Sequence, residues 1–333
     1  MSSISPLAPR PDNLKHWAKR YRTELAASSS TVLSTLIAFP LESVKTRIQS
    51  YPDSFVNCVQ KTFRDEGLKG FWRGVAAPLV SITAVRTLSF SVYQKAKYKA
   101  SATIGGLTGE DEPLIVVNRP GSIPNWGTIL CFGSAGAAAG AASTLLACPF
   151  ELTKNAMVIS KQIASSGVGT KAHPIRSSYQ NKNTFLTARQ IVRNCGVMGL
   201  YSGFQLQILR ETFGTAIYFM AYESLKQIVV KYEKTQSPTS PFAVAIAGGC
   251  SGIISLVSTY PLDRAKTAYQ RACLERGQSR PNVKYNIEYF KRASYQGVVV
   301  AASRSAITNA VLFSTFEYVK KRINALPDPD REA

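Results

Sequence analysis

The stretch AFPLESVKTRIQS, residues 38–50, ends an apolar segment with a proline that is closely followed by an acid and a base. Pro40, Glu42 and Lys45 form the pattern Pro-x-acid-x-x-base. A proline inside a helix removes a backbone hydrogen bond and kinks the helix. Taken alone, Glu42 and Lys45 are i,i+3 neighbours, so local pairing on one helix face is the simplest interpretation.

The same pattern occurs three times in the chain. PLESVK starts at Pro40, PFELTK starts at Pro149 and PLDRAK starts at Pro261, and each copy follows an apolar segment. The intervals are 109 and 112 residues, and such regular spacing indicates three tandem repeats. Three symmetric copies favour a shared role for the acids and bases over three separate local pairs.

Two further patterns recur in phase with the prolines. An aromatic-x-Gly sequence ends at Gly74, Gly203 and Gly297. An aromatic residue followed by an acid or glutamine, two residues and a base starts later in each repeat, at Tyr93, Tyr222 and Phe316. Each repeat is therefore expected to contain one apolar helix ending in the proline motif, an amphipathic segment and a second long helix.

The apolar segments are long enough to cross a membrane. Residues 128–150 and 241–262 carry no charge, and each can span the roughly 30 Å bilayer core as a helix. Gly136 and Gly140, and likewise Gly248 and Gly252, have the GxxxG spacing of closely packed membrane helices. The second helices, expected near 75–97, 204–226 and 298–320, carry interior charges that normally face a wet cavity or a partner. We therefore predict an all-α membrane protein with six transmembrane helices.

Charge and composition argue against several classes of function. The net charge of +20 suggests anionic partners, but the basic residues are scattered beside apolar segments, which is typical of membrane flanks rather than a nucleic-acid site. The chain has no CxxC pair and only two histidines, so we expect no metal and no cofactor. No nucleophile, histidine and acid set is evident, so we expect a protein that is not an enzyme.

The three motif sets resemble those of the mitochondrial carrier family, over residues 22–323. The resemblance implies a six-helix barrel of three pseudo-symmetric repeats with short amphipathic matrix helices. It also implies a multi-pass protein of the mitochondrial inner membrane that moves a solute by alternating access. The expected organisation is an N-terminal tail at 1–21, repeat 1 at 22–100, a linker at 101–124, repeat 2 at 125–233, a linker at 234–240, repeat 3 at 241–323 and a C-terminal tail at 324–333.

The resemblance also implies two gates. On the matrix side, beside Pro40, Pro149 and Pro261, the expected ion pairs are Glu42–Lys154, Glu151–Lys266 and Asp263–Lys45. On the cytoplasmic side the expected gate residues are Gln94, Lys97, Glu223, Lys226, Glu317 and Lys320. Gln94 stands where the family has an acid, so at most two ionic links, Glu223–Lys320 and Glu317–Lys97, are expected, and we predict a weakened cytoplasmic gate.

Substrate contacts are implied by the resemblance at Ser81, at Arg210 with Glu211 beside it, and at Arg304. Arginine suits a carboxylate and Glu211 suits an ammonium group, which favours an amino-acid- or carnitine-like zwitterion. If Glu211 only neutralises an arginine, the site suits a di- or tricarboxylate instead. A carrier-fold adaptor that transports nothing is a third possibility.

Three further expectations concern neighbouring features. Arg86 lies five residues from Ser81, so it is expected to be rotated off the substrate face and to serve packing or a gate. Cardiolipin is implied near Gly74, Gly203 and Gly297. The protein is expected to be a monomer whose partners are membrane lipid and a small anionic or zwitterionic substrate, with no nucleic acid.

Overall fold

The computed structural model describes residues 22–51, 53–109, 111–119, 121–165, 179, 183–233, 241–278, 287–289 and 291–324. These residues form helices and turns without any β-strand, so the predicted all-α class is confirmed. The expected N-terminal tail, residues 325–333, the 234–240 linker and most of the segment between residues 165 and 183 lie outside the described residues.

Six helices of 27 to 40 residues dominate the described chain, as the repeats predict. They are α2 (Arg22–Ser50), α4 (Ala76–Thr108), α6 (Trp126–Ser165), α9 (Phe204–Glu233), α10 (Pro241–Arg276) and α11 (Val298–Asn324). Between them lie α3 (Phe55–Glu66), α5 (Pro113–Val117), α8 (Thr184–Cys195) and the 3-10 turns η1 (Leu68–Trp72), η2 (Val197–Tyr201) and η3 (Arg292–Tyr295).

The long helices differ in how apolar they are. Among the described helices, α6 and α10 are long and apolar enough on their own to cross a membrane. The segments Leu68–Ile82 and Ala84–Thr108 meet this criterion only together, with a bend of 42° between them. The other long helices do not meet this criterion, because they contain polar and charged residues. Helices that line a polar path have this composition.

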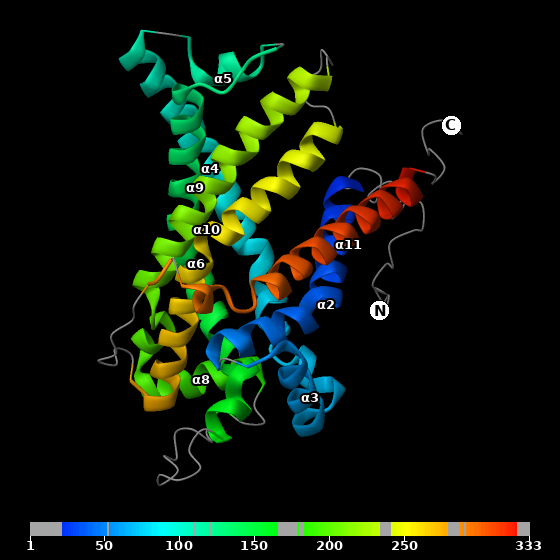
Figure 1. Cartoon of the computed structure of the whole chain (residues 1–333), viewed down its shortest axis with the longest axis vertical. Helices are drawn as coiled ribbons and strands as arrows, with labels where there is room; N and C mark the ends of the chain where they lie inside the picture. Colours follow the sequence, from blue (N-terminus) through cyan, green and yellow to red (C-terminus); the bar gives the residue numbers. More distant parts are fainter. Residues whose placement is uncertain are drawn as a thin grey trace, which may run out of the picture. The chain divides into compact units, whose positions relative to one another are not determined.

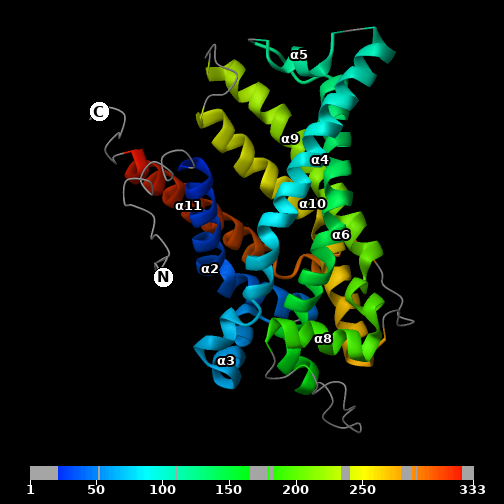
Figure 2. The same cartoon turned by 180° about the vertical axis from the view of Figure 1, so that it is seen from behind.

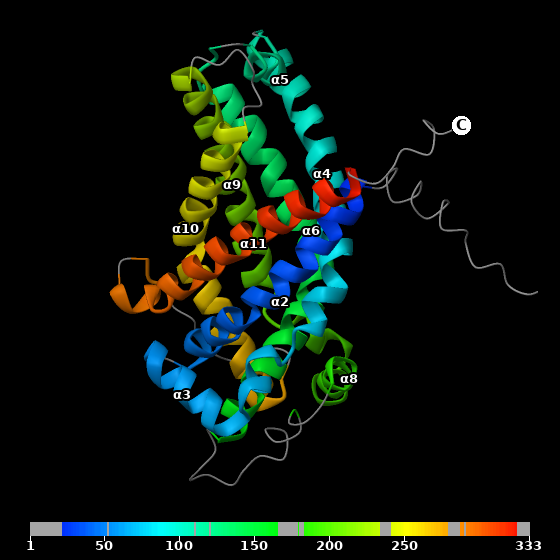
Figure 3. The same ribbon diagram turned by 90° about the vertical axis from the view of Figure 1, so that its right-hand side faces the viewer.

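Two compact units are present. One contains α2 up to Phe39 and α11 from Arg304, and the other, which we call the larger unit, contains residues 40–303. In the larger unit α6 packs against both α4 and α9, and α9 packs against α10 (Figures 1 and 2). Helices α3 and α8 lie at one end of this unit and α5 lies at the opposite end (Figure 3).

The amphipathic helices α3 and α8 end in the same way, but only α3 has a side-chain cap at its start. Ser54 caps α3 by accepting a hydrogen bond from the Asn57 backbone N–H, and Asn183 occupies the corresponding position before α8. Both helices end at a glycine in the left-handed region, Gly67 with φ 65° and Gly196 with φ 71°. The corresponding segment of repeat 3 lies largely outside the described residues.

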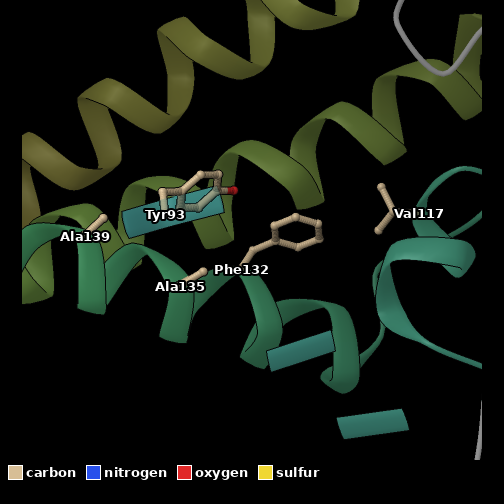
Figure 4. Close-up of a cluster of buried hydrophobic side chains, with 5 residues drawn as sticks. All are labelled: Tyr93, Val117, Phe132, Ala135 and Ala139. Carbon is tan, nitrogen blue, oxygen red and sulfur yellow. The ribbon is translucent and has the colours of Figure 1, made fainter. Parts of the chain in front are cut away.

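A buried apolar cluster joins α4, α5 and α6 near one end of the larger unit. It consists of Tyr93, Val117, Phe132, Ala135 and Ala139 (Figure 4). The Tyr93 ring also stacks on Phe219 of α9, with ring centroids 3.9 Å apart. The segment expected to be a plain linker therefore contributes a helical turn to the core, and α4 continues through Thr108 instead of ending near residue 97.

The two GxxxG pairs behave differently. A Cβ on Gly136 would lie 2.6 Å from the Thr215 carbonyl oxygen, and one on Gly140 would lie 2.4 Å from the Glu211 carbonyl oxygen. Helices α6 and α9 therefore approach closely through small residues, as GxxxG predicts. Around Gly248 and Gly252 of α10, no described atom of the larger unit lies within 4 Å of such a Cβ.

Candidate functional site

The acids and bases of the three proline motifs come together in the larger unit. Their ion pairs are Lys154 Nζ–Glu42 Oε1 at 2.9 Å, Lys266 Nζ–Glu151 Oε1 at 2.8 Å and Lys45 Nζ–Asp263 Oδ2 at 2.6 Å. We call these six residues the proline-motif network. All three pairs implied by the resemblance are present, and each joins two repeats.

Helix continuity explains this arrangement. Helices α2, α6 and α10 each run through their proline, so the acid and base three residues apart lie on one helix face. Each helix then reaches one neighbour with its acid and the other with its base. Within this network the Lys266 side chain is only 1% exposed, so losing its partner would leave a charge without water around it.

Two side-chain amides donate hydrogen bonds to carboxylates of the network. Gln49 Nε2 donates to Asp263 Oδ2 at 3.0 Å, and the Gln207 amide donates to Glu151. A separate amide pair links α6 to α10, since Asn155 Nδ2 donates to Gln270 Oε1 at 2.7 Å. Sequence reasoning did not identify Gln207 or Asn155, because neither residue belongs to a repeated motif. The only sequence signal for Gln207 is its position three residues before Arg210, on the same side of α9.

A further contact joins α2 to α10 beyond the network. The Tyr51 hydroxyl donates to the Glu275 carboxylate, and Arg271 donates to the Ser50 carbonyl oxygen. The Arg271 guanidinium also lies 4.5 Å from the centre of the Tyr51 ring, in cation–π geometry. Repeats 1 and 3 are therefore held together by two layers of polar contacts.

The aromatic-x-Gly motifs are explained by close packing. Gly74, Gly203 and Gly297 have φ angles of 93°, 80° and 89°, which L-residues rarely adopt. Each glycine also lies against a proline-motif helix of another repeat. The nearest atoms to an added Cβ would be Lys154 O at 3.2 Å, Gln270 Cγ at 3.2 Å and, for the third glycine, Tyr260 Oη at 2.8 Å and Ile48 Cγ2 at 3.3 Å.

One proline motif has a visible compensation for its missing N–H. Pro149 cannot donate to the carbonyl of Leu145 four residues earlier. The Tyr201 hydroxyl, from the aromatic-x-Gly motif of the same repeat, donates to that oxygen at 3.4 Å. The two motifs of repeat 2 are thus connected physically as well as in sequence phase.

The expected substrate contacts on α9 are in contact with each other and with the network. The Arg210 guanidinium donates to the Glu211 carboxylate, and its Nε lies 3.6 Å from Asp263 Oδ1. The Arg210 and Glu211 side chains retain exposures of 27% and 19%. In this conformation Glu211 therefore neutralises Arg210. Arg304 is in the smaller unit, where its carbonyl oxygen accepts a hydrogen bond from Thr308.

Ser81 lines a cavity of about 270 Å³ between α4 and α6. Glu151 and Lys154 of the network reach this cavity, and so does Arg86. The expectation that Arg86 is rotated off the face of Ser81 is therefore wrong. The α4 residues that line the cavity are Pro78, Ser81, Ile82, Val85 and Arg86, which have the spacing of one broad helix face with Ser81 and Arg86 at its two edges.

The aromatic-motif residues of the larger unit pair locally. Lys226 Nζ lies 2.5 Å from Glu223 Oε2 on the same helix. Lys97 Nζ lies 5.7 Å and 5.3 Å from the ring centres of Tyr93 and Tyr98. Gln94 is exposed. The side chains of Glu317 and Lys320 lie outside the described residues, so their expected links are not described.

Six long helices in three repeats, joined at proline motifs by ion pairs between repeats, define an all-α membrane carrier. The chain belongs to the mitochondrial carrier family, whose members are transporters. It matches the family described as Mitochondrial carrier protein over residues 16–101, 125–233 and 237–325, which confirms the resemblance drawn from the motifs.

Characterised relatives cover nearly the whole chain. The Mitochondrial ornithine transporter 1 of Schizosaccharomyces pombe is 28% identical over 89% of this chain and 91% of its own length. The Mitochondrial basic amino acids transporter of Rattus norvegicus is 29% identical, over 93% and 92%. The human Mitochondrial carnitine/acylcarnitine carrier protein is 26% identical, over 90% and 93%.

Proposed function

We propose that this protein carries an amino-acid- or carnitine-like zwitterion across the mitochondrial inner membrane by alternating access. The observation that carries the proposal is the adjacent pair of opposite charges, Arg210 and Glu211, in contact with the proline-motif network. In this proposal the network is the matrix-side gate, and the aromatic-motif residues form the opposite gate.

The chemistry of the pair suits a solute with both charges. A guanidinium presents a planar fork to a carboxylate, and Glu211 accepts hydrogen bonds from an ammonium group. A zwitterion can replace the Arg210–Glu211 contact group by group, which leaves neither charge unpaired in a low-dielectric site. The names of the three relatives support this class, since ornithine, basic amino acids and carnitine each combine a carboxylate with a cationic nitrogen.

The position of Arg210 supplies a reason for transport to depend on binding. A solute carboxylate that engages Arg210 competes with Asp263 for the same guanidinium. Asp263 then loses one of its cationic neighbours, and the gate pair with Lys45 loses part of its electrostatic support. A ligand shifts a conformational equilibrium only through such a difference in contacts between states.

A di- or tricarboxylate is the competing substrate class. The observed contact of Glu211 with Arg210 favours this class, because in that contact Glu211 neutralises an arginine. Glu211→Gln separates the two classes in proteoliposomes. We expect uptake of labelled ornithine, arginine, lysine or carnitine to fall by roughly 10- to 100-fold, the loss of a charged hydrogen bond. If uptake of citrate or malate persists or rises in this variant, the carboxylate class is correct. If the wild-type protein neither takes up nor exchanges any of these solutes, it is a carrier-fold adaptor.

The proposal extends to the surroundings of the protein. We place it in the inner membrane as a multi-pass monomer, with cardiolipin at the turns near Gly74, Gly203 and Gly297. Detergent-purified protein should then gain thermal stability from cardiolipin and elute with the mass of one chain plus micelle. An equal shift with phosphatidylcholine would contradict specific cardiolipin binding.

A further inference from the structure

We infer that Gln207 of α9 is a positioning residue of the matrix-side gate, which holds Glu151 toward Lys266 and ties the substrate helix to that ion pair. This inference rests on the proposed function, because it assigns a part in the transport cycle to a residue outside the repeated motifs. Helix α9 packs against both α6, which carries Glu151, and α10, which carries Lys266 (Figure 1).

The Gln207 amide and the Lys266 ammonium share one carboxylate. Gln207 Nε2 donates to Glu151 Oε2, while Lys266 Nζ donates to Glu151 Oε1 at 2.8 Å. An ionised carboxylate only accepts hydrogen bonds, so the Nε2 end of the amide must face it. The Gln207 side chain is fully buried, so water does not compete for this contact. Both oxygens of Glu151 therefore have protein donors, which fixes the direction of the carboxylate.

The contact with Glu151 is kept at a cost to the other end of the same amide. Gln207 Oε1 is buried and has no hydrogen-bond partner in the described part of the chain. A buried acceptor without a partner is destabilising. Gln49, which donates to Asp263, also accepts from Thr267 Oγ1 at 3.4 Å, so both ends of that amide are used. The donor end of Gln207 is therefore the end that explains a buried glutamine at this position.

Helix α9 supplies an amide that the proline motif of repeat 3 does not. In repeat 1, Gln49 donates to Asp263, the acid that pairs with the lysine four residues before this glutamine. In repeat 3, Gln270 has the equivalent position, but its oxygen accepts from Asn155 and its Nε2 has no partner in the described residues. Gln207 takes over the role of donor to the acid on that side of the network.

The position of Gln207 connects the network to the expected substrate contacts. Its backbone N–H donates to Gly203 O at 3.0 Å, and Gly203 lies against Gln270 of α10, which fixes the first turn of α9. One turn later, Arg210 Nε lies 3.6 Å from Asp263 Oδ1. Helix α9 therefore reaches two acids of the network, through an amide and through a guanidinium. A solute carboxylate at Arg210 weakens the second contact but not the first, so movement of α9 reaches the gate through Gln207.

The test exchanges the amide and the carboxylate in the full chain, reconstituted in proteoliposomes. Gln207→Glu alone places two carboxylates together, and Glu151→Gln alone removes the partner of Lys266 at 2.8 Å. Each single variant should lower uptake of labelled ornithine, arginine, lysine and carnitine by about 10- to 100-fold. The double variant again has one amide opposite one carboxylate, and it should be more active than both single variants. A double variant that does not exceed both overturns the inference, since a residue that only fills space is not rescued by the exchange.

The matched controls use a second glutamine on the same helix. Gln205 lies two residues earlier on α9 and is exposed. Gln205→Glu and Gln205→Leu should transport like the wild type. Gln207→Leu keeps a similar side-chain volume but removes the donor, and its maximal uptake rate should fall by about 10-fold or more. Wild-type uptake in Gln207→Leu overturns the inference.

The inference is judged separately from the proposed function. If the wild-type protein transports none of the four zwitterions, the proposed function fails, and the same exchange is followed by the melting temperatures of the purified proteins in detergent. A double variant that melts above both Gln207→Glu and Glu151→Gln keeps Gln207 as the residue that positions Glu151. A double variant that does not melt above both overturns it.

Discussion

Arg210 of α9 and Asp263 of α10 connect the expected substrate position to the proline-motif network. Arg210 Nε lies 3.6 Å from Asp263 Oδ1, while Asp263 Oδ2 accepts hydrogen bonds from Lys45 at 2.6 Å and Gln49 at 3.0 Å. One carboxylate therefore serves an ion pair between repeats, an amide brace and a contact with the α9 arginine. Its removal should affect the gate and the substrate position together.

The first prediction concerns this carboxylate. Asp263→Asn should destabilise the protein by about 3–5 kcal/mol, because breaking a buried pair leaves Lys45 and its neighbours with excess positive charge. Solute uptake into proteoliposomes should also fall in this variant. Thermal unfolding in detergent, followed at a fixed lipid content, measures the stability. A melting temperature equal to that of the wild type would show that this carboxylate does not hold the network.

The second prediction uses the pair Glu42–Lys154. Glu42→Lys and Lys154→Glu should each reduce transport strongly, because each places like charges 2.9 Å apart in the original geometry. The double swap restores opposite charges and should recover much of the activity. Uptake by the three variants forms a double-mutant cycle. If the double variant is no more active than the worse single variant, these two residues do not act as a pair.

An exposed pair offers the control. Lys61 Nζ lies 2.6 Å from Asp53 Oδ2 at the start of α3, with the Lys61 side chain 69% exposed. The hydrogen bond from Lys61 lowers the pKa of the Asp53 carboxyl. Surface pairs of this kind contribute at most about 1 kcal/mol. Lys61→Ala should therefore leave both transport and thermal stability close to those of the wild type.

The third prediction concerns helix packing. Gly136→Ala should cost about 1–3 kcal/mol, because the added methyl would lie 2.6 Å from the Thr215 carbonyl oxygen of α9. Gly248→Ala has the same GxxxG context but no described neighbour in the larger unit within 4 Å. It should be neutral or stabilising, since alanine favours the helix over glycine by roughly 0.5–1 kcal/mol. Equal melting temperatures for the two variants would contradict the packing difference.

The fourth prediction addresses the opposite gate. Gln94 is exposed on α4 and stands where the repeats otherwise carry an acid, while Lys226 pairs with Glu223 on its own helix. Gln94→Glu should offer Lys226 a second carboxylate and strengthen closure on that side. Transport rates and labelling of an engineered cysteine near the gate report this closure. Unchanged kinetics together with unchanged labelling would count against a weakened gate.

The sequence by itself determined the repeats, because the motifs recur in phase at intervals of 109 and 112 residues. The partners within the proline-motif network were implied by the resemblance to the mitochondrial carrier family, since repetition alone does not say whether an acid meets a base of the next repeat or of the preceding one. The aromatic-x-Gly positions were fixed by the same recurrence, although their φ angles and close contacts with the proline-motif helices explain why glycine is needed there.

The tertiary structure decided what repetition does not encode. Gln207 donates to Glu151 of the network, Asn155 joins α6 to α10 through Gln270, and Arg210 reaches Asp263 across a repeat boundary. Two GxxxG pairs that look alike in sequence differ in what lies beside them. Ser81 and Arg86 line one cavity together, because α6 packs beside the broad face of α4 that holds residues 78, 81, 82, 85 and 86, and only the packing shows which face of a helix a neighbour covers.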